Sequence, residues 1–238
     1  MGPDPLTVVV VIPTYNEREN LEALVNQVLS HGYSVLIVDD NSPDGTGALA
    51  DMLASKHGRR VEVLHRTGPR GLGRSYLEGL QRALAAGADR ICQMDADFSH
   101  DPKYLPELVA ASEQFDLVLG SRYLNGVSVV NWPLHRIVLS AFANRYVRFV
   151  TGLRPRDCTS GFRCWRREAL AKIRFDRIRS EGYSFLVELL YEAHVRGCTI
   201  GEVPIIFVER RSGASKMSGA VMRESAITPW RVRLRGRG

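Results

Sequence analysis

The stretch Ile91-Cys92-Gln93-Met94-Asp95-Ala96-Asp97 decides how the rest of this chain is interpreted. Its apolar start predicts a buried strand, and its end carries two acids spaced i, i+2. Because side chains alternate between the two faces of a strand, we expect Asp95 and Asp97 to leave the sheet on the same side, at its carboxyl end. Ligands bind at that end of open α/β sheets, and two carboxylates suit Mg²⁺ or Mn²⁺. The spacing alone is common by chance, so the neighbouring segments have to support a metal site.

Strand-like and helix-like segments alternate on both sides of this stretch. Short apolar runs rich in β-branched residues predict further strands at Leu6–Ile12, Ser34–Val38, Val61–Leu64 and Asp116–Leu119. Apolar residues at helical spacing predict helices over 20–32, 46–56, 74–86 and 103–112. Strands separated by single helices are typical of a mostly parallel α/β sheet flanked by helices, in a Rossmann-like arrangement. We expect one domain of this class.

Charge is unevenly distributed along the 238 residues. The formal net charge is +6, and four of the last eight residues are Arg. We therefore expect a folded domain over residues 1–225 and a flexible basic tail over 226–238. The four cysteines lack zinc-like spacing, so we expect reduced thiols in a cytosolic protein. We expect neither a signal peptide nor a membrane span, because no apolar run reaches about 18 residues.

Polar loops follow several of the predicted strands. Pro13-Thr14-Tyr15-Asn16-Glu17 follows the first and Asp39-Asp40 ends the second, so their side chains are expected to converge with Asp95 and Asp97 on one crevice. An Asp after the second strand is well placed to accept hydrogen bonds from a ribose, although a plain polar turn explains that loop equally well. The glycine-rich loop Arg66–Gly73 opens a helix and can offer backbone amides to phosphate, but an ordinary loop is the simpler interpretation.

The carboxyl half has a different character. Residues 132–150 predict a helix with a broad apolar face and a basic edge, which either packs in the core or lies on a membrane surface. Residues 157–163 are interpreted as a polar turn, 185–194 as a helix, and 199–208 as a pair of strands. Residues 209–216 read as a basic loop, either solvated or able to fold over phosphates.

Together these motifs resemble family 2 inverting glycosyltransferases, and more narrowly the dolichol-phosphate (polyprenol-phosphate) mannosyltransferases. The broad resemblance covers Pro13–Glu17, Val38–Thr46, Asp95–His100 with Pro102, and Gly120–Tyr123. The narrow one rests on Arg136, Ser140 and Asn144, on Thr159–Arg163, and on Gly201–Pro204 leading to Arg210, Gly213, Ser215 and Lys216. It spans about residues 7–220 and implies a GT-A fold, a GDP-mannose donor, a divalent metal and a lipid-phosphate acceptor.

The resemblance also implies roles for particular residues. The nucleoside would be held by Pro13, Tyr15, Glu17 and Asp39, and the metal and diphosphate by Asp95 and Asp97. The acceptor phosphate would be held by Arg122 and Arg136 with Ser140, and the donor diphosphate would be clamped by Arg210 and Lys216. The catalytic set is then Asp95, Asp97, Arg122 and Arg136, with Mg²⁺ or Mn²⁺ as the metal.

The expected chemistry needs no general base. A phosphate monoester has its second pKa at about 6, so at neutral pH it is mostly a dianion and already a nucleophile. Attack opposite the nucleotide inverts the anomeric centre, while the metal and cations stabilise the leaving diphosphate.

Two rivals remain. One is a transferase that uses UDP-glucose with the same acceptor, and the other is a non-catalytic nucleotide-binding subunit. A nucleic-acid partner is not expected, because no aromatic residues interleave with the four arginines of residues 231–238 to stack on bases. We expect the protein in the cytoplasm, peripheral on the cytosolic face of a membrane. Attachment would use the surface helix and the tail, or a separate membrane-anchoring partner protein.

Overall fold

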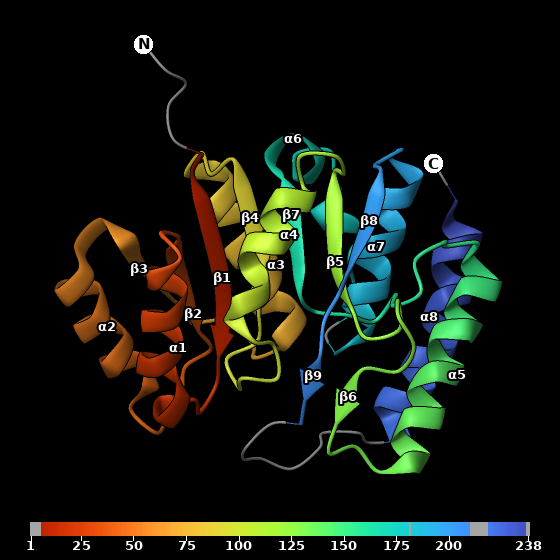
Figure 1. Cartoon of the computed structure of the whole chain (residues 1–238), viewed down its shortest axis with the longest axis horizontal. Helices are drawn as coiled ribbons and strands as arrows, with labels where there is room; N and C mark the ends of the chain where they lie inside the picture. The colour runs from red at the N-terminus through yellow and green to blue at the C-terminus, as the bar shows by residue number, and fades with distance from the viewer. Residues whose placement is uncertain (1–5, 181, 210–218, 237–238) are drawn as a thin grey trace.

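The computed structural model describes every residue except 1–5, 181, 210–218 and 237–238. At its centre lies a seven-stranded sheet in the order β3-β2-β1-β4-β7-β5-β8 (Figure 1). The strands are β1 (Val8–Thr14), β2 (Ser34–Asp39), β3 (Val61–His65), β4 (Arg90–Gln93), β5 (Leu117–Ser121), β7 (Arg163–Arg166) and β8 (Ile200–Pro204). β7 runs antiparallel to both neighbours, and the other pairings in this sheet are parallel. A separate parallel pair joins β6 (Val129–Val130) to β9 (Phe207–Val208).

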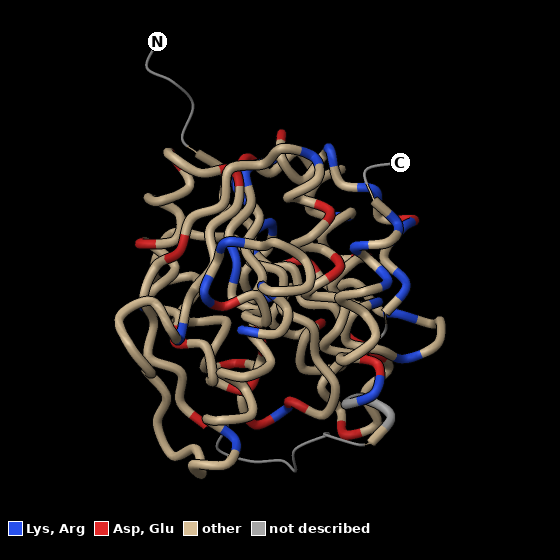
Figure 2. The backbone as a smooth tube through the Cα atoms, turned by 90° about the vertical axis from the view of Figure 1, so that its right-hand side faces the viewer, with Lys and Arg blue, Asp and Glu red and all other residues tan. Residues whose placement is uncertain are grey.

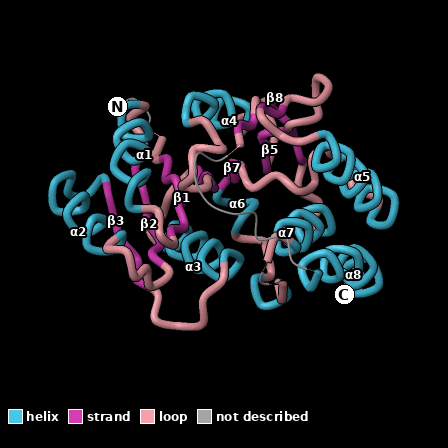
Figure 3. Tube along the Cα trace, turned by 90° about the horizontal axis from the view of Figure 1, so that it is seen from below, coloured by secondary structure: helices cyan, strands magenta, loops and turns pink. Residues whose placement is uncertain are grey.

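Helices cover both faces of the sheet (Figure 3). The core on one face includes α1 (Arg18–Ser30), α2 (Thr46–His57) and α4 (Leu105–Ala111). The core on the other includes α3 (Leu72–Ala85), α6 (Arg167–Leu170) and α7 (Ser184–Val195). At one edge of the molecule α5 (Leu134–Thr151) and α8 (Gly219–Arg235) pack against each other, and α8 also packs on α7. Single 3₁₀ turns occur at Gly58–Arg60, Pro102–Tyr104 and Phe175–Arg177.

The continuous apolar runs fold as expected because both faces of the sheet are covered. Val10, Val11 and Ile12 of β1 are fully buried, with one core on each side of the strand. The mostly parallel α/β fold in a single domain is confirmed. The two strands expected within 199–208 are present, but an expected pairing between them is wrong, because β8 adds to β5 in the main sheet whereas β9 pairs with β6.

The expectation of a flexible tail from residue 226 is also wrong. Residues 226–235 form the second half of α8, in which Thr228 and Val232 are buried. Val232 belongs to the same core cluster as α7. The sequence of this segment does not indicate a helix, because Pro229 and several arginines lie within it and the buried partners of the arginines are distant in the chain. None of the described helices is long and apolar enough to cross a bilayer.

Candidate active site

A cleft of about 390 Å³ opens where β1, β2 and β4 end. Ligand sites of open α/β sheets occupy this position, outside the carboxyl ends of the strands. Of the residues predicted for the nucleotide and metal, Pro13, Tyr15, Glu17, Asp95 and Asp97 line this cleft. Its other lining residues are Thr14, Asp40, Arg70, Gly71, Leu72, Ser75, Ala96, Gly182 and Tyr183. Convergence of the strand-end loops on one crevice is therefore confirmed.

The two acids reach the cleft by a different route from the one expected. β4 ends at Gln93, so Asp95 and Asp97 lie in the turn that follows it, and the argument from strand alternation is wrong. The Asp97 carboxylate accepts a hydrogen bond from the Ser99 amide at 3.0 Å, and Phe98 between them has a φ of 59°. This tight turn, residues 95–99, holds both carboxylates at the cleft wall, and we call it the acid loop.

Tyr76 and His100 fix the position of Asp95. The buried Tyr76 hydroxyl donates to Asp95 Oδ1 at 2.6 Å, and burial followed by the nearby charge of Asp95 raises the pKa of this phenol. The Asp95 amide donates to His100 Nδ1 at 3.1 Å, so Nδ1 carries no proton. The 3.8 Å separation between Nδ1 and Asp95 Oδ2 is therefore not an ion pair, and burial lowers the pKa of His100. A neutral imidazole thus supports the acid loop.

At the end of β2 the cleft is lined by Asp40, whereas Asp39 is turned into the protein. Asp39 is held by the Ser42 hydroxyl at 2.6 Å and lies beside Gly47. Asp40 accepts from the Gly71 amide at 2.8 Å and pairs with buried Arg66. That amide and that guanidinium are thereby engaged within the protein.

Arg70 is the cation of the glycine-rich loop that lines the cleft. It is exposed, and its guanidinium hydrogen-bonds to the Tyr15 hydroxyl. The part of the loop able to meet an anion is therefore the Arg70 side chain, and the Gly71 amide is not available in this arrangement.

The donor set at Asp95 and Asp97 fits a hard divalent cation. Mg²⁺ in particular is commonly held by one or two carboxylates together with substrate phosphates and water. Within the described ranges there is no group of three or more His, Cys, Asp or Glu that would form a closed protein site. An ion held here would accordingly complete its coordination with oxygens from the bound nucleotide and from water.

The residues predicted for the acceptor form a second group, outside the set that lines the cleft. Trp132 brings the two arginines together, since the Arg136 and Arg122 guanidinium carbons lie 4.0 and 5.6 Å from its ring centroid. Ser140 accepts a hydrogen bond from the Tyr123 hydroxyl at 2.7 Å. We call Arg122, Arg136 and Ser140 the basic cluster.

Arg122 is held in place by a buried carboxylate. Its Nε and Nη2 each donate to Asp157 at 2.7 Å, and Nη2 also donates to Thr159. Thr159 in turn accepts from Asn144 of α5. Burial alone would raise the pKa of Asp157, but attraction to Arg122 and several hydrogen bonds outweigh burial and lower it. Residues 157–163, interpreted as a polar turn, therefore include a fully buried acid.

Aromatic rings connect the acid loop to the basic cluster. His100 stacks on Phe162 and meets Phe207 edge-on, and the guanidinium of Arg122 lies 5.4 Å from the Phe207 centroid. Arg136 also pairs with Glu209. The predicted clamp residues Arg210 and Lys216 lie outside the described residues.

The sequence model of glycosyl transferase family 2 matches residues 9–174. The chain belongs to this family. Polyprenol monophosphomannose synthase of Mycolicibacterium smegmatis is 47% identical over 244 residues, covering 98% of this chain and 92% of the relative. Undecaprenyl-phosphate mannosyltransferase of Micrococcus luteus is 42% identical over 237 residues, covering 98% and 97% of the two chains.

Solved structures with 18–19% identity share the fold. Glucosyl-3-phosphoglycerate synthase from Mycobacterium tuberculosis, with Mn²⁺, UDP and its product, has a TM-score of 0.66 and covers 95% of this chain and 80% of its own. A mannosyltransferase from Pyrobaculum calidifontis, with GDP-Man and Mn²⁺, has a TM-score of 0.59 and covers 98% and 66%. The expected GT-A fold is confirmed.

Two residues that support the site, Tyr76 and Asp157, have no distinguishing signal in the sequence. Tyr76 lies on the buried face of an amphipathic helix, where a core tyrosine and a tyrosine that supports a carboxylate look alike. Asp157 does not differ in the sequence from the other polar residues of 157–163. Its pairing with Arg122, 35 positions away, has no local signal in the sequence.

Proposed function

We propose that this protein transfers mannose from GDP-mannose to a polyprenyl (dolichyl) phosphate, with inversion at the anomeric carbon and release of GDP. The observation that supports this most strongly is the similarity, over 98% of the chain, to two curated relatives named as polyprenol monophosphomannose synthase and undecaprenyl-phosphate mannosyltransferase. The proposal is also supported by the cleft with its acid loop and by the basic cluster connected to it, which are two candidate sites for the two anionic substrates.

In this proposal the cleft holds the donor. Pro13, Tyr15 and Glu17 contact the nucleoside, and Asp95 with Asp97 holds a divalent metal, Mg²⁺ or Mn²⁺, which would neutralise the diphosphate. Asp39 is assigned the nucleoside by family resemblance, and its buried side chain would act through Ser42 and the β2 loop. Arg210 and Lys216 remain predicted contacts to the donor diphosphate.

The basic cluster orients the acceptor. One oxygen of its phosphate dianion forms a bond to the anomeric carbon while the bond from that carbon to the diphosphate oxygen breaks, and GDP leaves with the electron pair. Because the nucleophile is already ionised, no side chain has to remove a proton. The Nδ1 atom of His100 is not available to accept a proton, because it already accepts a hydrogen bond from the Asp95 amide. Arg122, Arg136 and Ser140 hold the phosphate in line for attack.

We also propose that the protein works as a peripheral enzyme on the cytosolic face of a membrane, because the acceptor's prenyl chain stays in the bilayer. A membrane-anchoring partner protein is the competing explanation for attachment.

A turnover assay with a short-chain polyprenyl phosphate and a panel of nucleotide sugars tests the proposed reaction. We expect mannose transfer from GDP-mannose that requires a divalent metal. Asp97→Asn should lose about 100-fold or more of the activity, the size of loss seen when one electrostatic stabiliser is removed. Asp101→Asn is the matched control, because Asp101 lies near the same loop but caps the Pro102 turn and does not line the cleft.

Preference for UDP-glucose would move the assignment to the glucosyl rival. Full activity of Asp97→Asn in the presence of a chelator would refute the metal site. Absence of turnover with tight nucleotide binding would favour the non-catalytic subunit.

A further inference from the structure

The two arginines of the basic cluster are both neutralised in this structure. Arg122 is paired with Asp157, and Arg136 is paired with Glu209. The negative charge of Asp95 also acts on Arg122. Figure 2 views the molecule from the side on which α5 lies and shows acidic and basic positions interspersed along the chain. Because a site of zero net charge attracts a phosphate dianion only weakly, one of the two paired acids has to leave its arginine before the acceptor binds tightly.

Asp157 is fixed in the protein interior. Its carboxylate is fully buried and accepts hydrogen bonds from the Arg122 side chain, from the Arg122 amide and from the Thr159 hydroxyl. Moving this carboxylate would leave Arg122 as an unpaired charge in the interior, which is strongly unfavourable. Asp157 therefore stays on Arg122 when a ligand binds.

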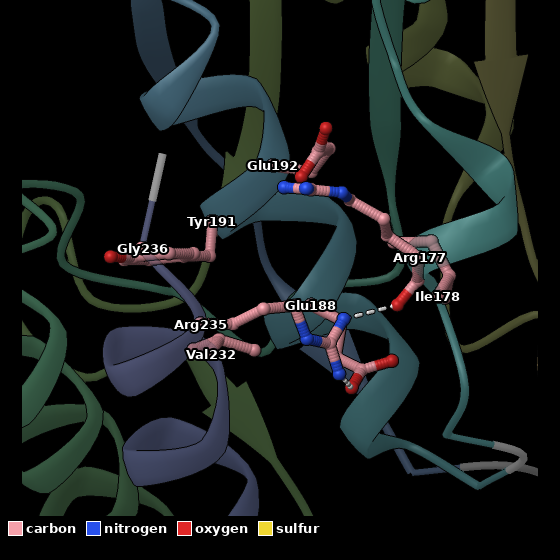
Figure 4. Close-up of a pocket in the computed structure, with 8 residues that line it drawn as sticks. All are labelled: Arg177, Ile178, Glu188, Tyr191, Glu192, Val232, Arg235 and Gly236. Atoms are coloured by element: carbon pink, nitrogen blue, oxygen red, sulfur yellow. Dashed lines mark hydrogen bonds and ion pairs between the residues drawn. The ribbon is translucent and has the colours of Figure 1, made fainter. Parts of the chain in front are cut away.

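Glu188 of α7 is a permanent counter-ion of the same kind elsewhere in the molecule (Figure 4). It is 2% exposed, accepts hydrogen bonds from the amides of Arg179 and Ser180, and lies 3.8 Å from Arg235. The hollow beside it measures about 10 Å³, which is room for no more than one water. A buried acid with several donors and no adjoining space is a fixed part of the packing.

Glu209 differs from both of these acids. Its side chain is 32% exposed, and the Arg136 side chain with which it pairs is 28% exposed. Within the described part of the chain, the Arg136 guanidinium is the partner that the structure gives to this carboxylate. The Glu209 amide donates to the Val130 carbonyl at 3.2 Å, which anchors the backbone directly after the β6–β9 pair. Rotation of the side chain alone therefore moves the carboxylate into water, at the small cost of a partly exposed ion pair.

Arg136 keeps its place when Glu209 turns away. Its guanidinium carbon lies 4.0 Å from the centroid of the Trp132 ring, and Trp132 meets Phe207 of β9 edge-on with centroids 5.4 Å apart. An arginine stacked on an aromatic ring is held by its flat face, so the N–H groups at its edge stay available to an anion. Without Glu209, the two arginines and Asp157 together carry one net positive charge next to these donors.

We propose that Glu209 is an exchangeable counter-ion of the acceptor site, which the acceptor phosphate displaces from Arg136 and which returns to Arg136 after the transfer. The identity of that phosphate rests on the proposed function, whereas the exchange itself requires only a phosphate monoester. The acceptor arrives as a dianion and leaves as a diester with one negative charge, so the site holds the product less strongly. Glu209 then competes for Arg136 again, which favours release of the product.

Calorimetry with a short-chain prenyl phosphate tests the exchange without a donor and without turnover. The variant is Glu209→Gln, which keeps the shape of the side chain and removes its charge. Glu62→Gln is the matched control, because Glu62 is 43% exposed and pairs with Arg82 at 2.5 Å. It lies on β3, at the opposite edge of the sheet from β8, and the substitution changes the net charge by the same amount.

We expect Glu209→Gln to bind the prenyl phosphate about fivefold more tightly than the unaltered chain, the factor that corresponds to a partly exposed ion pair. Glu62→Gln should bind it within about twofold of the unaltered chain, and neither variant should change thermal unfolding much. The gain should disappear when Arg136→Gln is added to Glu209→Gln, because the two side chains then no longer compete with the phosphate.

Three results overturn the proposal. Unchanged affinity in Glu209→Gln means that the ion pair is not broken on binding, and weaker binding means that Glu209 orients Arg136 for the phosphate. Absence of binding by both the unaltered chain and the variant means that the basic cluster is not a phosphate site.

Steady-state kinetics with GDP-mannose adds a readout that a merely structural role would not produce. In Glu209→Gln the KM for the acceptor should fall about fivefold while kcat does not rise, because the product is also held more tightly. A structural defect would instead lower kcat and raise KM. If no sugar nucleotide is turned over but Glu209→Gln still binds the prenyl phosphate more tightly, the reaction assignment fails and the counter-ion stands. Turnover of GDP-mannose with unchanged acceptor binding in Glu209→Gln has the opposite meaning.

Discussion

Replacing Asp157 by Ala is expected to destabilise the fold strongly. The carboxylate is fully buried and accepts from Arg122 Nε and Nη2, both at 2.7 Å, and from the Arg122 amide at 3.1 Å. Two hydrogen bonds to a charged group contribute about 1.5–3 kcal/mol each. Losing one partner of a buried ion pair costs about 3–5 kcal/mol, which agrees with that sum. We therefore expect the free energy of unfolding, measured by urea denaturation, to fall by about 3–5 kcal/mol.

The pair of Arg122 and Asp157 also determines how the loss of stability in Asp157→Ala depends on pH. The folded-state pKa of Asp157 is held below its ordinary value of 3.8, so its contribution is present above that value and is lost as pH falls through the folded pKa. The difference between the unaltered chain and Asp157→Ala should accordingly shrink below about pH 4. Arg122→Met/Asp157→Leu should lose less stability than Asp157→Ala, because no charge is left buried alone. A loss under about 1 kcal/mol, the value of an exposed pair, would refute the reasoning.

Three further outcomes are expected. Tyr76→Phe removes the hydrogen-bond donor to Asp95 and should raise the Mn²⁺ concentration needed for half-maximal turnover by about tenfold, with little change in the thermal unfolding temperature. An unchanged metal titration would mean that Tyr76 contributes packing alone. Gly79→Ala should lower the free energy of unfolding, measured by urea denaturation, by about 1–3 kcal/mol, because the added Cβ would lie 2.5 Å from Val11 and 2.8 Å from Val38. A gain in stability, from the higher helix propensity of Ala, would contradict the close packing of α3 on β1. Calorimetry with Mn²⁺ should show GDP binding more tightly than UDP, and equal affinities would count against a guanosine site.

The elements that the sequence predicts best are those indicated by residues next to one another in the chain. A strand covered on both faces needs a continuous apolar run, so β1 and β2 were located to within two residues at each end. The acid loop was placed correctly at the cleft although it lies beyond the strand, because Pro13–Glu17 and Asp95–Asp97 follow neighbouring parallel strands.

Elements that depend on distant partners were not predictable in the same way. β7 begins at Arg163, a charged residue that is fully buried because the carbonyls of Ser160 and Leu186 accept its hydrogen bonds. Trp165, in the same strand, donates a hydrogen bond from its indole nitrogen to the Gln93 side chain of β4. α8 likewise depends on Glu188. In both elements polar residues occupy buried positions, and the sequence alone does not show which groups satisfy them.

The antiparallel strand β7 has a consequence for the order in which the sheet is completed during synthesis. β1 to β4 leave the ribosome early and pair with one another in the order β3-β2-β1-β4, which leaves one edge of β4 for β7. β5 follows, but both of its neighbours, β7 and β8, are made later. Until Arg163–Arg166 emerges, the growing chain carries two apolar strands with open edges, which are the sites where nascent chains aggregate or recruit chaperones. Insertion of β7 covers the free edge of β4 and one edge of β5, and so joins the two parts of the sheet; the other edge of β5 stays open until β8 is made.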